Sequence, residues 1–180
     1  MAKEFHHLLS VFGGGRIWSR LVGASALFSV VSTPVIAEGT VILPPDAQAL
    51  TSVELYMIYR DKSWLWSDGA GRMNDEGRSF SAWSDGKDGV TWADGRWIVT
   101  DTGFLCLKAI WHSATGAFPN KTCFSHRVYN GTIYQRKEPN GSWYVFRSST
   151  SDKDGEFAKL TKEDVVSQPQ SDIKASLSRK

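Results

Sequence analysis

Short runs in which apolar and polar residues alternate, separated by turn-forming pairs, occupy most of the chain from Trp64 onward. Alternation with a period of two is typical of β-strands that turn one face toward a core. The runs lie near residues 63–67, 70–74, 78–84, 89–94, 95–100, 104–112, 122–129, 132–138 and 142–147, with a weak run near 156–161. The pattern predicts a mainly β domain: an antiparallel meander of about 8–9 short strands, curled into a barrel or half-barrel because closure removes exposed edges.

Three turn sequences set the expected register of these strands. Asp94-Gly95 is a two-residue hairpin signal, which would place Trp92 directly opposite Trp97. Asp101-Thr102-Gly103 predicts a three-residue loop, and Asn130-Gly131 predicts a second tight hairpin. The last two turns predict the cross-strand pairs Val99–Leu105, Ile98–Cys106, Trp97–Leu107, Val128–Ile133 and His126–Gln135.

Placing Cys106 opposite Cys123 in this register gathers the large apolar side chains on one face of the sheet. That face holds Trp92, Trp97, Val99, Leu105, Leu107, Trp111, Phe124 and Val128. The other face holds the two cysteines with Lys108, Ser125 and Arg127. A slip of one residue would invert this arrangement, so the separation of the two sets supports the register.

The two cysteines, Cys106 and Cys123, are the only ones in the chain. An even number of cysteines in an exported protein indicates a disulfide. The alternative is a metal site with His112 and His126, but on the predicted strands these four side chains do not converge. We therefore expect a disulfide and no metal site.

One helix is expected, from about Ala47 to Arg60. Thr51 and Glu54 form a capping-box sequence, and the apolar residues that follow recur at helical spacing. We expect this helix to plug one end of the β domain or to pack on its open side. The residues from 166 to 180 are rich in Ser, Gln and Lys, which predicts a flexible tail.

The first 37 residues resemble a signal peptide. A basic leader precedes an apolar stretch beginning at Leu21, and Val35-Ile36-Ala37 fits a cleavage site after Ala37. A membrane anchor or a buried helix would be the alternatives, but the stretch contains Pro34 and is short for a span of about 20 residues. We expect a signal peptide at 1–37, a single β domain at 38–165, periplasmic or secreted localisation, and no stable membrane span after cleavage.

The charge balance excludes one class of partner. The whole chain carries a net charge of +2, but residues 1–37 hold three of its 21 basic residues and one of its 19 acidic residues. The remaining domain is therefore neutral overall. Nucleic-acid binding needs a basic footprint, so no nucleic-acid partner is expected.

The chain also resembles a family of exported α-proteobacterial proteins that is known only as a domain of unknown function, number 995. The match extends from Leu55 to Leu160, and two of its strings, Cys-Phe-x-His-Arg and Tyr-Gln-Arg, are fairly specific. The strings that carry the resemblance are Lys62-Ser63-Trp64-Leu65-Trp66, Gly69-Ala70-Gly71, Gly95-Arg96-Trp97-Ile98-Val99, Leu105-Cys106, Ala109-Ile110-Trp111, Cys123-Phe124-Ser125-His126-Arg127, Ile133-Tyr134-Gln135-Arg136 and Gly141-Ser142-Trp143-Tyr144-Val145-Phe146. The resemblance implies export and the two cysteines, and it brings no established activity.

The hairpin around Asn130-Gly131 carries the first candidate site residues. His126 and Gln135 should face each other on the apolar side, while Tyr134 and Arg136 should lie on the other side. His126 and Gln135 could hydrogen-bond each other inside the sheet, since buried polar groups need partners. They could instead be the polar groups of an aromatic-lined pocket.

Tryptophan supplies the second group of candidates, because the chain contains eight such residues. Most should fill the core. Trp66 and Trp83 are flanked by Ser, Asp and Gly and are expected to reach solvent, where they could bind a glycan.

No pattern of catalytic or cofactor-binding residues is present, so none is predicted. The sequence favours a non-catalytic periplasmic binding or cell-envelope accessory module that binds a small apolar or glycan ligand, or an envelope protein. One alternative is a periplasmic hydrolase that uses His126 with a carboxylate such as Asp94 or Glu138. Another is a protein-interaction domain that uses an exposed sheet edge.

Overall fold

The computed structural model describes residues 40–151, 153 and 155–179. The predicted signal peptide, residues 1–37, lies outside the described residues. No helix in the described part of the chain is both long and apolar enough to cross a membrane.

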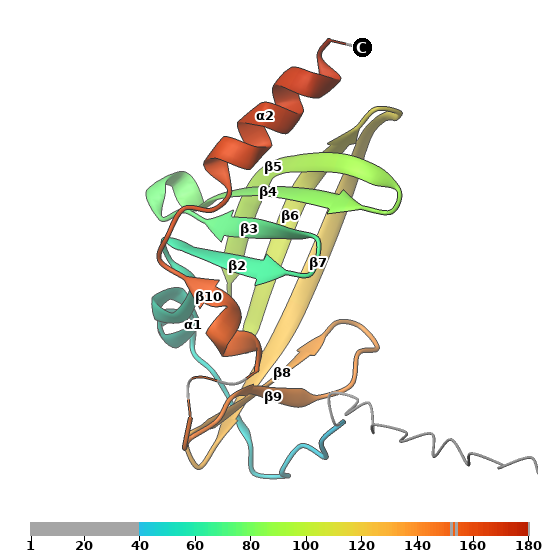
Figure 1. Cartoon of the computed structure of the whole chain (residues 1–180). Helices are drawn as coiled ribbons and strands as arrows, with labels where there is room; N and C mark the ends of the chain where they lie inside the picture. The colour runs from blue at the N-terminus through green and yellow to red at the C-terminus, as the bar shows by residue number, and fades with distance from the viewer. Residues whose placement is uncertain (1–39, 152, 154, 180) are drawn as a thin grey trace, which may run out of the picture. The chain divides into compact units, whose positions relative to one another are not determined.

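A single antiparallel sheet forms most of the described structure and curls into a half-barrel (Figure 1). Its strands follow the order β10-β2-β3-β4-β5-β6-β7-β8-β9, and a short β1 pairs with β7. The strands are β1 (Gln48–Ala49), β2 (Lys62–Trp66), β3 (Gly69–Met73), β4 (Ser79–Gly86), β5 (Gly89–Val99), β6 (Phe104–Ser113), β7 (Gly116–Tyr129), β8 (Thr132–Lys137), β9 (Tyr144–Arg147) and β10 (Leu160–Thr161). The predicted β meander and its curvature are confirmed.

The two edges of the sheet, β9 and β10, are connected by the short 3₁₀-helix η2 (Glu156–Lys159). This segment contacts both β9 and β2. The ring of Phe157 packs edge-on against Phe146, with 5.8 Å between the ring centroids. In a full barrel, hydrogen bonds between β9 and β10 would close the sheet. Here the side chain of Phe157 in η2 fills part of the gap between these two edge strands.

The register predicted beyond Val99 is confirmed. Val99 pairs with Leu105 across the 101–103 loop, and His126 pairs with Gln135 across the Asn130-Gly131 turn. Cys106 pairs with Cys123 and forms the predicted disulfide, with 4.1 Å between the Cα atoms. The cystine lies on the outer, convex face, because its neighbours Leu105 and Phe124 face the core on the inner, concave face.

The turn predicted at Asp94-Gly95 is wrong. Strand β5 runs without interruption from Gly89 to Val99, and the turn lies earlier, between Gly86 and Gly89. Trp92 consequently pairs with Trp83 and with His112 rather than with Trp97. In one continuous strand, residues 92 and 97 point to opposite faces. Trp92 therefore lies on the convex face, where its ring stacks on His112 at 3.8 Å.

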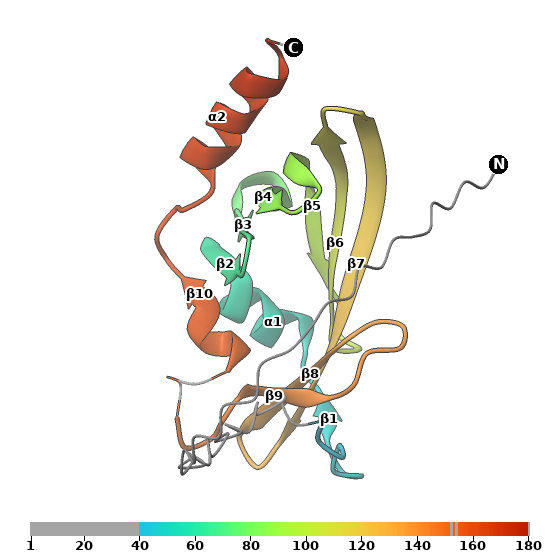
Figure 2. The same ribbon diagram turned by 45° about the vertical axis from the view of Figure 1, so that its right-hand side comes forward.

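Helix α1 (Ser52–Tyr59) confirms the predicted helix, although it is shorter than expected because residues 48–49 form β1. Both hydrogen bonds of the capping box between Thr51 and Glu54 are present. The side of the helix that packs against the core consists of the buried residues Leu55, Ile58 and Tyr59. Figure 2 shows α1 on the inner side of the curved sheet, between β2 and the long strands β6 and β7.

A second helix, α2 (Ser167–Leu177), occupies the segment for which a flexible tail was predicted. The carboxylate of Asp164 accepts hydrogen bonds from the backbone of Val166 and Ser167 and so caps the helix start. The side chain of Gln170 donates to the backbone carbonyl of Ala93 at 2.7 Å and to Asp94 at 2.8 Å. These bonds fix α2 on β4 and β5 (Figure 1).

Candidate functional site

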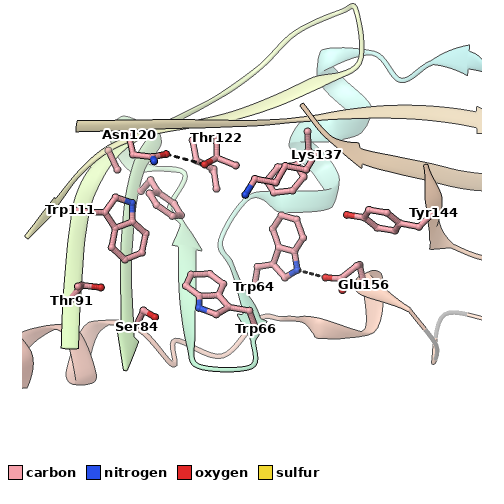
Figure 3. Close-up of a pocket in the computed structure, with 14 residues that line it drawn as sticks. Trp64, Trp66, Ser84, Thr91, Trp111, Asn120, Thr122, Lys137, Tyr144 and Glu156 are labelled. Carbon is pink, nitrogen blue, oxygen red and sulfur yellow. Dashed lines mark hydrogen bonds between the residues drawn. The ribbon is translucent and has the colours of Figure 1, made fainter. Parts of the chain in front are cut away.

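A cleft of about 680 Å³ opens on the concave face of the sheet. Its volume lies within the range of roughly 300–1,000 Å³ that is typical of small-molecule sites. Apolar and aromatic side chains form most of its wall, with neutral polar groups and two charged side chains between them (Figure 3). The lining residues are Trp64, Trp66, Phe80, Ser84, Thr91, Leu107, Ala109, Trp111, Asn120, Thr122, Phe124, Lys137, Tyr144 and Glu156.

Strand periodicity explains why these residues share one face. Every second residue of β6 from Leu107 to Trp111 lines the cleft, as does every second residue of β7 from Asn120 to Phe124. Successive side chains of a strand point to opposite faces, so these two strands contribute a continuous wall. The curvature of the sheet then brings Trp64 and Trp66 of β2 to the facing wall (Figure 3).

A glycine makes room for the aromatic side chains on the β2 side. A Cβ atom on Gly71 would lie 2.7 Å from the ring of Phe80 and 3.2 Å from that of Trp66. Both distances are shorter than ordinary van der Waals contacts of about 3.5–4.0 Å. The absence of a side chain at Gly71 therefore lets both rings approach the backbone of β3 closely.

Polar groups of the cleft are held by defined hydrogen bonds. The indole nitrogen of Trp64 donates to Glu156 at 3.1 Å, and Glu156 also pairs with Lys159. The Thr122 hydroxyl donates to the side-chain oxygen of Asn120 at 3.0 Å. The amide nitrogen of Asn120 and the lone pairs of Thr122 remain available to bind a ligand.

His126 and Gln135 lie on the same concave face but beside the cleft rather than in its wall, and both side chains are fully buried. The ring of His126 lies 2.7 Å from the hydroxyl of Tyr59 and 2.6 Å from the amide of Gln135, both measured at Nε2. Its Nδ1 lies 3.3 Å from the carbonyl oxygen of Gly103. Because a carbonyl can only accept, we assign the proton to Nδ1, and Nε2 is then the acceptor.

The buried network reaches the cleft through one residue. Tyr144 lines the cleft, and its hydroxyl donates to the side-chain oxygen of Gln135. Gln135 in turn donates to Tyr59 at 2.9 Å. The network therefore holds Tyr144 in the cleft wall, and burial of fully satisfied polar groups favours one fixed arrangement.

Desolvation lowers the pKa of His126 from its ordinary value of 6.5 to about 4. The unfolded chain therefore takes up a proton near pH 6.5, whereas the folded protein resists protonation until about pH 4. We expect stability to be greatest above pH 6.5 and to fall by about 2 kcal/mol between pH 7 and pH 5 from this group alone. Urea unfolding followed by circular dichroism at several pH values measures the loss.

The variant His126→Gln provides the control for this pH dependence, because it has no titrating group at the site. Its stability should change less than that of the wild type between pH 7 and pH 5, whatever its absolute value. An equal slope in both proteins would show that other groups cause the pH dependence.

The candidate residues predicted from the sequence do not form one site. Trp66 lines the cleft, whereas Trp83 lies on the convex face and donates to the carbonyl of Val165 at 3.1 Å. Tyr134 and Arg136 also face outward on β8, and Arg136 pairs with Glu138 at 2.8 Å. Among these candidates, His126 and Gln135 hydrogen-bond each other, and Trp66 and Trp83 both line a second, smaller pocket.

The pair of His126 with a carboxylate, which the hydrolase alternative needs, is absent from the described residues. Glu138 binds Ser125 and Arg136 on the convex side. Asp94 binds Gln170 and Lys174. Neither carboxylate bonds to His126, whose ring nitrogens contact a phenol, an amide and a backbone carbonyl. The described residues also contain no group of three or more His, Cys, Asp or Glu side chains that could hold a metal ion.

Several residues of the cleft were missed as binding residues by the sequence analysis. Asn120 and Thr122 could have been found by extending the alternation backward from Phe124 along β7. Glu156 and Tyr144 come from segments whose positions depend on how the sheet edges meet. Nothing in the local sequence indicates that they reach the cleft.

Comparison with known proteins identifies a family and no activity. No curated protein and no solved structure shows a significant match to the chain. A family model described as "Protein of unknown function (DUF995)" matches residues 26–166. This match covers most of the chain, including every strand of the sheet, and the protein therefore belongs to the DUF995 family.

Proposed function

We propose that the protein is a non-catalytic binding module that holds a small glycan in the concave cleft. The observation that carries the proposal is the position of Trp111. Figure 3 shows its ring between Asn120 and Thr122 on one side and Ser84 and Thr91 on the other. An aromatic ring with hydrogen-bonding side chains at both edges matches the chemistry of a pyranose.

A pyranose ring has an apolar surface of C–H groups and an edge of hydroxyl groups. The first packs on an aromatic ring, and the second needs donors and acceptors in defined positions. In the cleft, Ser84 donates its hydroxyl to Asp68 at 3.1 Å, so its lone pairs can accept from a ligand. Trp66 supplies a further aromatic surface on the facing wall.

A purely apolar ligand would use the same rings but would leave the polar groups around Trp111 without a role. The hydrolase alternative is less well supported, because His126 is buried under Tyr59 outside the cleft and has no carboxylate partner among the described residues. We therefore favour glycan binding over an apolar ligand and over hydrolase activity. An envelope protein that uses the sheet edges β9 and β10 would be an alternative partner.

The proposed location is outside the cytoplasm. The disulfide supports it, because cystines persist in the periplasm and in secreted proteins. The signal-peptide pattern in residues 1–37 supports it independently. A module of this kind would meet the saccharides of the cell envelope.

The substitution Trp111→Ala tests the proposal. We expect the wild-type protein to bind members of an array of neutral and acidic oligosaccharides. Loss of the ring should weaken the best of them at least about tenfold, because truncated aromatic anchors cost the most in binding sites. Isothermal titration calorimetry measures the dissociation constants.

Trp92→Ala is the matched control, since Trp92 is on the convex face on the neighbouring strand β5. This variant should bind as the wild type does. Absence of binding to every glycan of the array, or equal affinity of the Trp111→Ala variant, would refute the proposal.

A further inference from the structure

Two charged side chains line the cleft, Lys137 and Glu156, and they differ in their surroundings. Glu156 is neutralised, because one of its oxygens pairs with Lys159 and the other accepts the hydrogen bond from Trp64. Its carboxylate serves to orient an indole ring. It therefore presents little negative charge to a ligand.

The positive charge of Lys137, in contrast, is not neutralised by an ion pair with a described residue. Lys137 pairs with Phe124 in the β7–β8 register and so points to the concave face. Figure 3 shows its amino group turned toward the interior of the cleft. Within residues 40–151, 153 and 155–179, this amino group forms no ion pair and no hydrogen bond.

The nearest carboxylate along the chain is unavailable to Lys137. Glu138 points to the convex face, where it binds Arg136 and Ser125. The alternation of β8 thus pairs its outward arginine with an acid and leaves its inward lysine exposed in an aromatic cleft. Such a cation favours a ligand that carries an anion beside an apolar surface.

We propose that the cleft selects acidic saccharides, with Lys137 binding the carboxylate of a uronic-acid-type residue. This inference rests on the proposed glycan function and specifies the class of glycan. The pyranose ring lies on the aromatic wall, and its carboxylate is directed toward the Lys137 amino group. The lysine acts as a positively charged specificity residue, and the neutral polar side chains around Trp111 hold the hydroxyl groups.

A matched pair of small probes tests the selection: phenyl β-D-glucuronide and phenyl β-D-glucoside. The two differ in a carboxylate and a hydroxymethyl group on the same ring. We expect the wild type to bind the glucuronide about three- to fivefold more tightly than the glucoside at low ionic strength, because exposed ion pairs are weak. The preference should shrink as salt is added, because salt screens exposed charges. Calorimetry measures both dissociation constants.

Three variants assign the preference to one side chain. Lys137→Met should abolish it by weakening only the binding of the glucuronide, whereas Lys137→Arg should retain it. Lys121→Met removes a lysine from the convex side of β7 and should leave the preference unchanged. Folding of each variant is checked by circular dichroism.

The outcomes separate this inference from the proposed function. Equal binding of the two probes by the wild type, or a preference that survives in Lys137→Met, overturns the selection for acidic saccharides and leaves the glycan proposal in place. Binding of free phenol as tightly as of either glycoside would show that the ring alone is recognised. That result, or no binding of either glycoside, overturns the selection for acidic saccharides, whereas the glycan proposal is overturned by absence of binding to every oligosaccharide of the array.

Discussion

Replacing Gly95 by alanine is expected to lower the free energy of unfolding by on the order of 3 kcal/mol, the upper range for overpacking a well-filled site. A Cβ atom at this position would lie 2.1 Å from the carbonyl oxygen of Lys108 and 2.5 Å from the Cα of Ala109. Both atoms belong to the backbone of β6, so no side chain can move aside. Strands β5 and β6 would have to separate at the centre of the sheet.

The variant Gly86→Ala is the control for this effect. A Cβ atom there would approach a carboxylate oxygen of Asp68 at 2.7 Å, and this side chain can rotate away. We expect a loss below about 1 kcal/mol for Gly86→Ala. Urea unfolding of both variants measures the difference, and a Gly95→Ala protein as stable as the wild type would contradict the close approach of the two strands.

Gly95 also explains why a hairpin turn was wrongly predicted at Asp94-Gly95. Asp-Gly is a strong hairpin signal, but a glycine inside a strand can also mark a close approach of backbones. Only the neighbouring strand shows which reading applies. The error moved Trp92 to the wrong face, whereas the pairs beyond Val99 were predicted correctly, because two turns and the cysteine pair required the same register.

Helix α2 illustrates a second limit of sequence analysis. Its composition is polar, which correctly indicates that it has little apolar surface to bury. Its position depends instead on long-range contacts, such as those of Gln170 with Ala93 and of Lys174 with Asp94. Local sequence carries no sign of partners so far away along the chain.

The cleft was predictable only in part: strand alternation indicates its face, but long-range packing decides its position. Alternation predicted that Trp111 and Phe124 share a face with His126, and the strand pairing confirms this. It could not predict which part of that face is filled by the core and which part stays open. Tyr59 of α1 covers His126, whereas the region around Trp111 remains accessible in the cleft. That division depends on where the helix docks.

Removal of the disulfide is expected to lower the free energy of unfolding by about 3 kcal/mol, because the cross-link between Cys106 and Cys123 restricts the unfolded chain. The double variant Cys106→Ala/Cys123→Ala, compared with the wild type in urea unfolding, measures the loss. Unchanged stability would show that the cross-link contributes nothing. Reduction of the wild type should give a similar destabilisation.

Ligand binding should respond differently to the same change. The cystine lies on the convex face, whereas the adjacent residues Leu107 and Phe124 line the cleft on the concave face. The hydrogen bonds of β6 and β7 hold this register without the cross-link, so the folded fraction of the double variant should keep its wild-type affinity for a glycan. A large loss of affinity in protein that is still folded would mean that the disulfide shapes the cleft. Stability and binding would then be coupled through β6 and β7, and the two faces of the sheet could not be treated as independent.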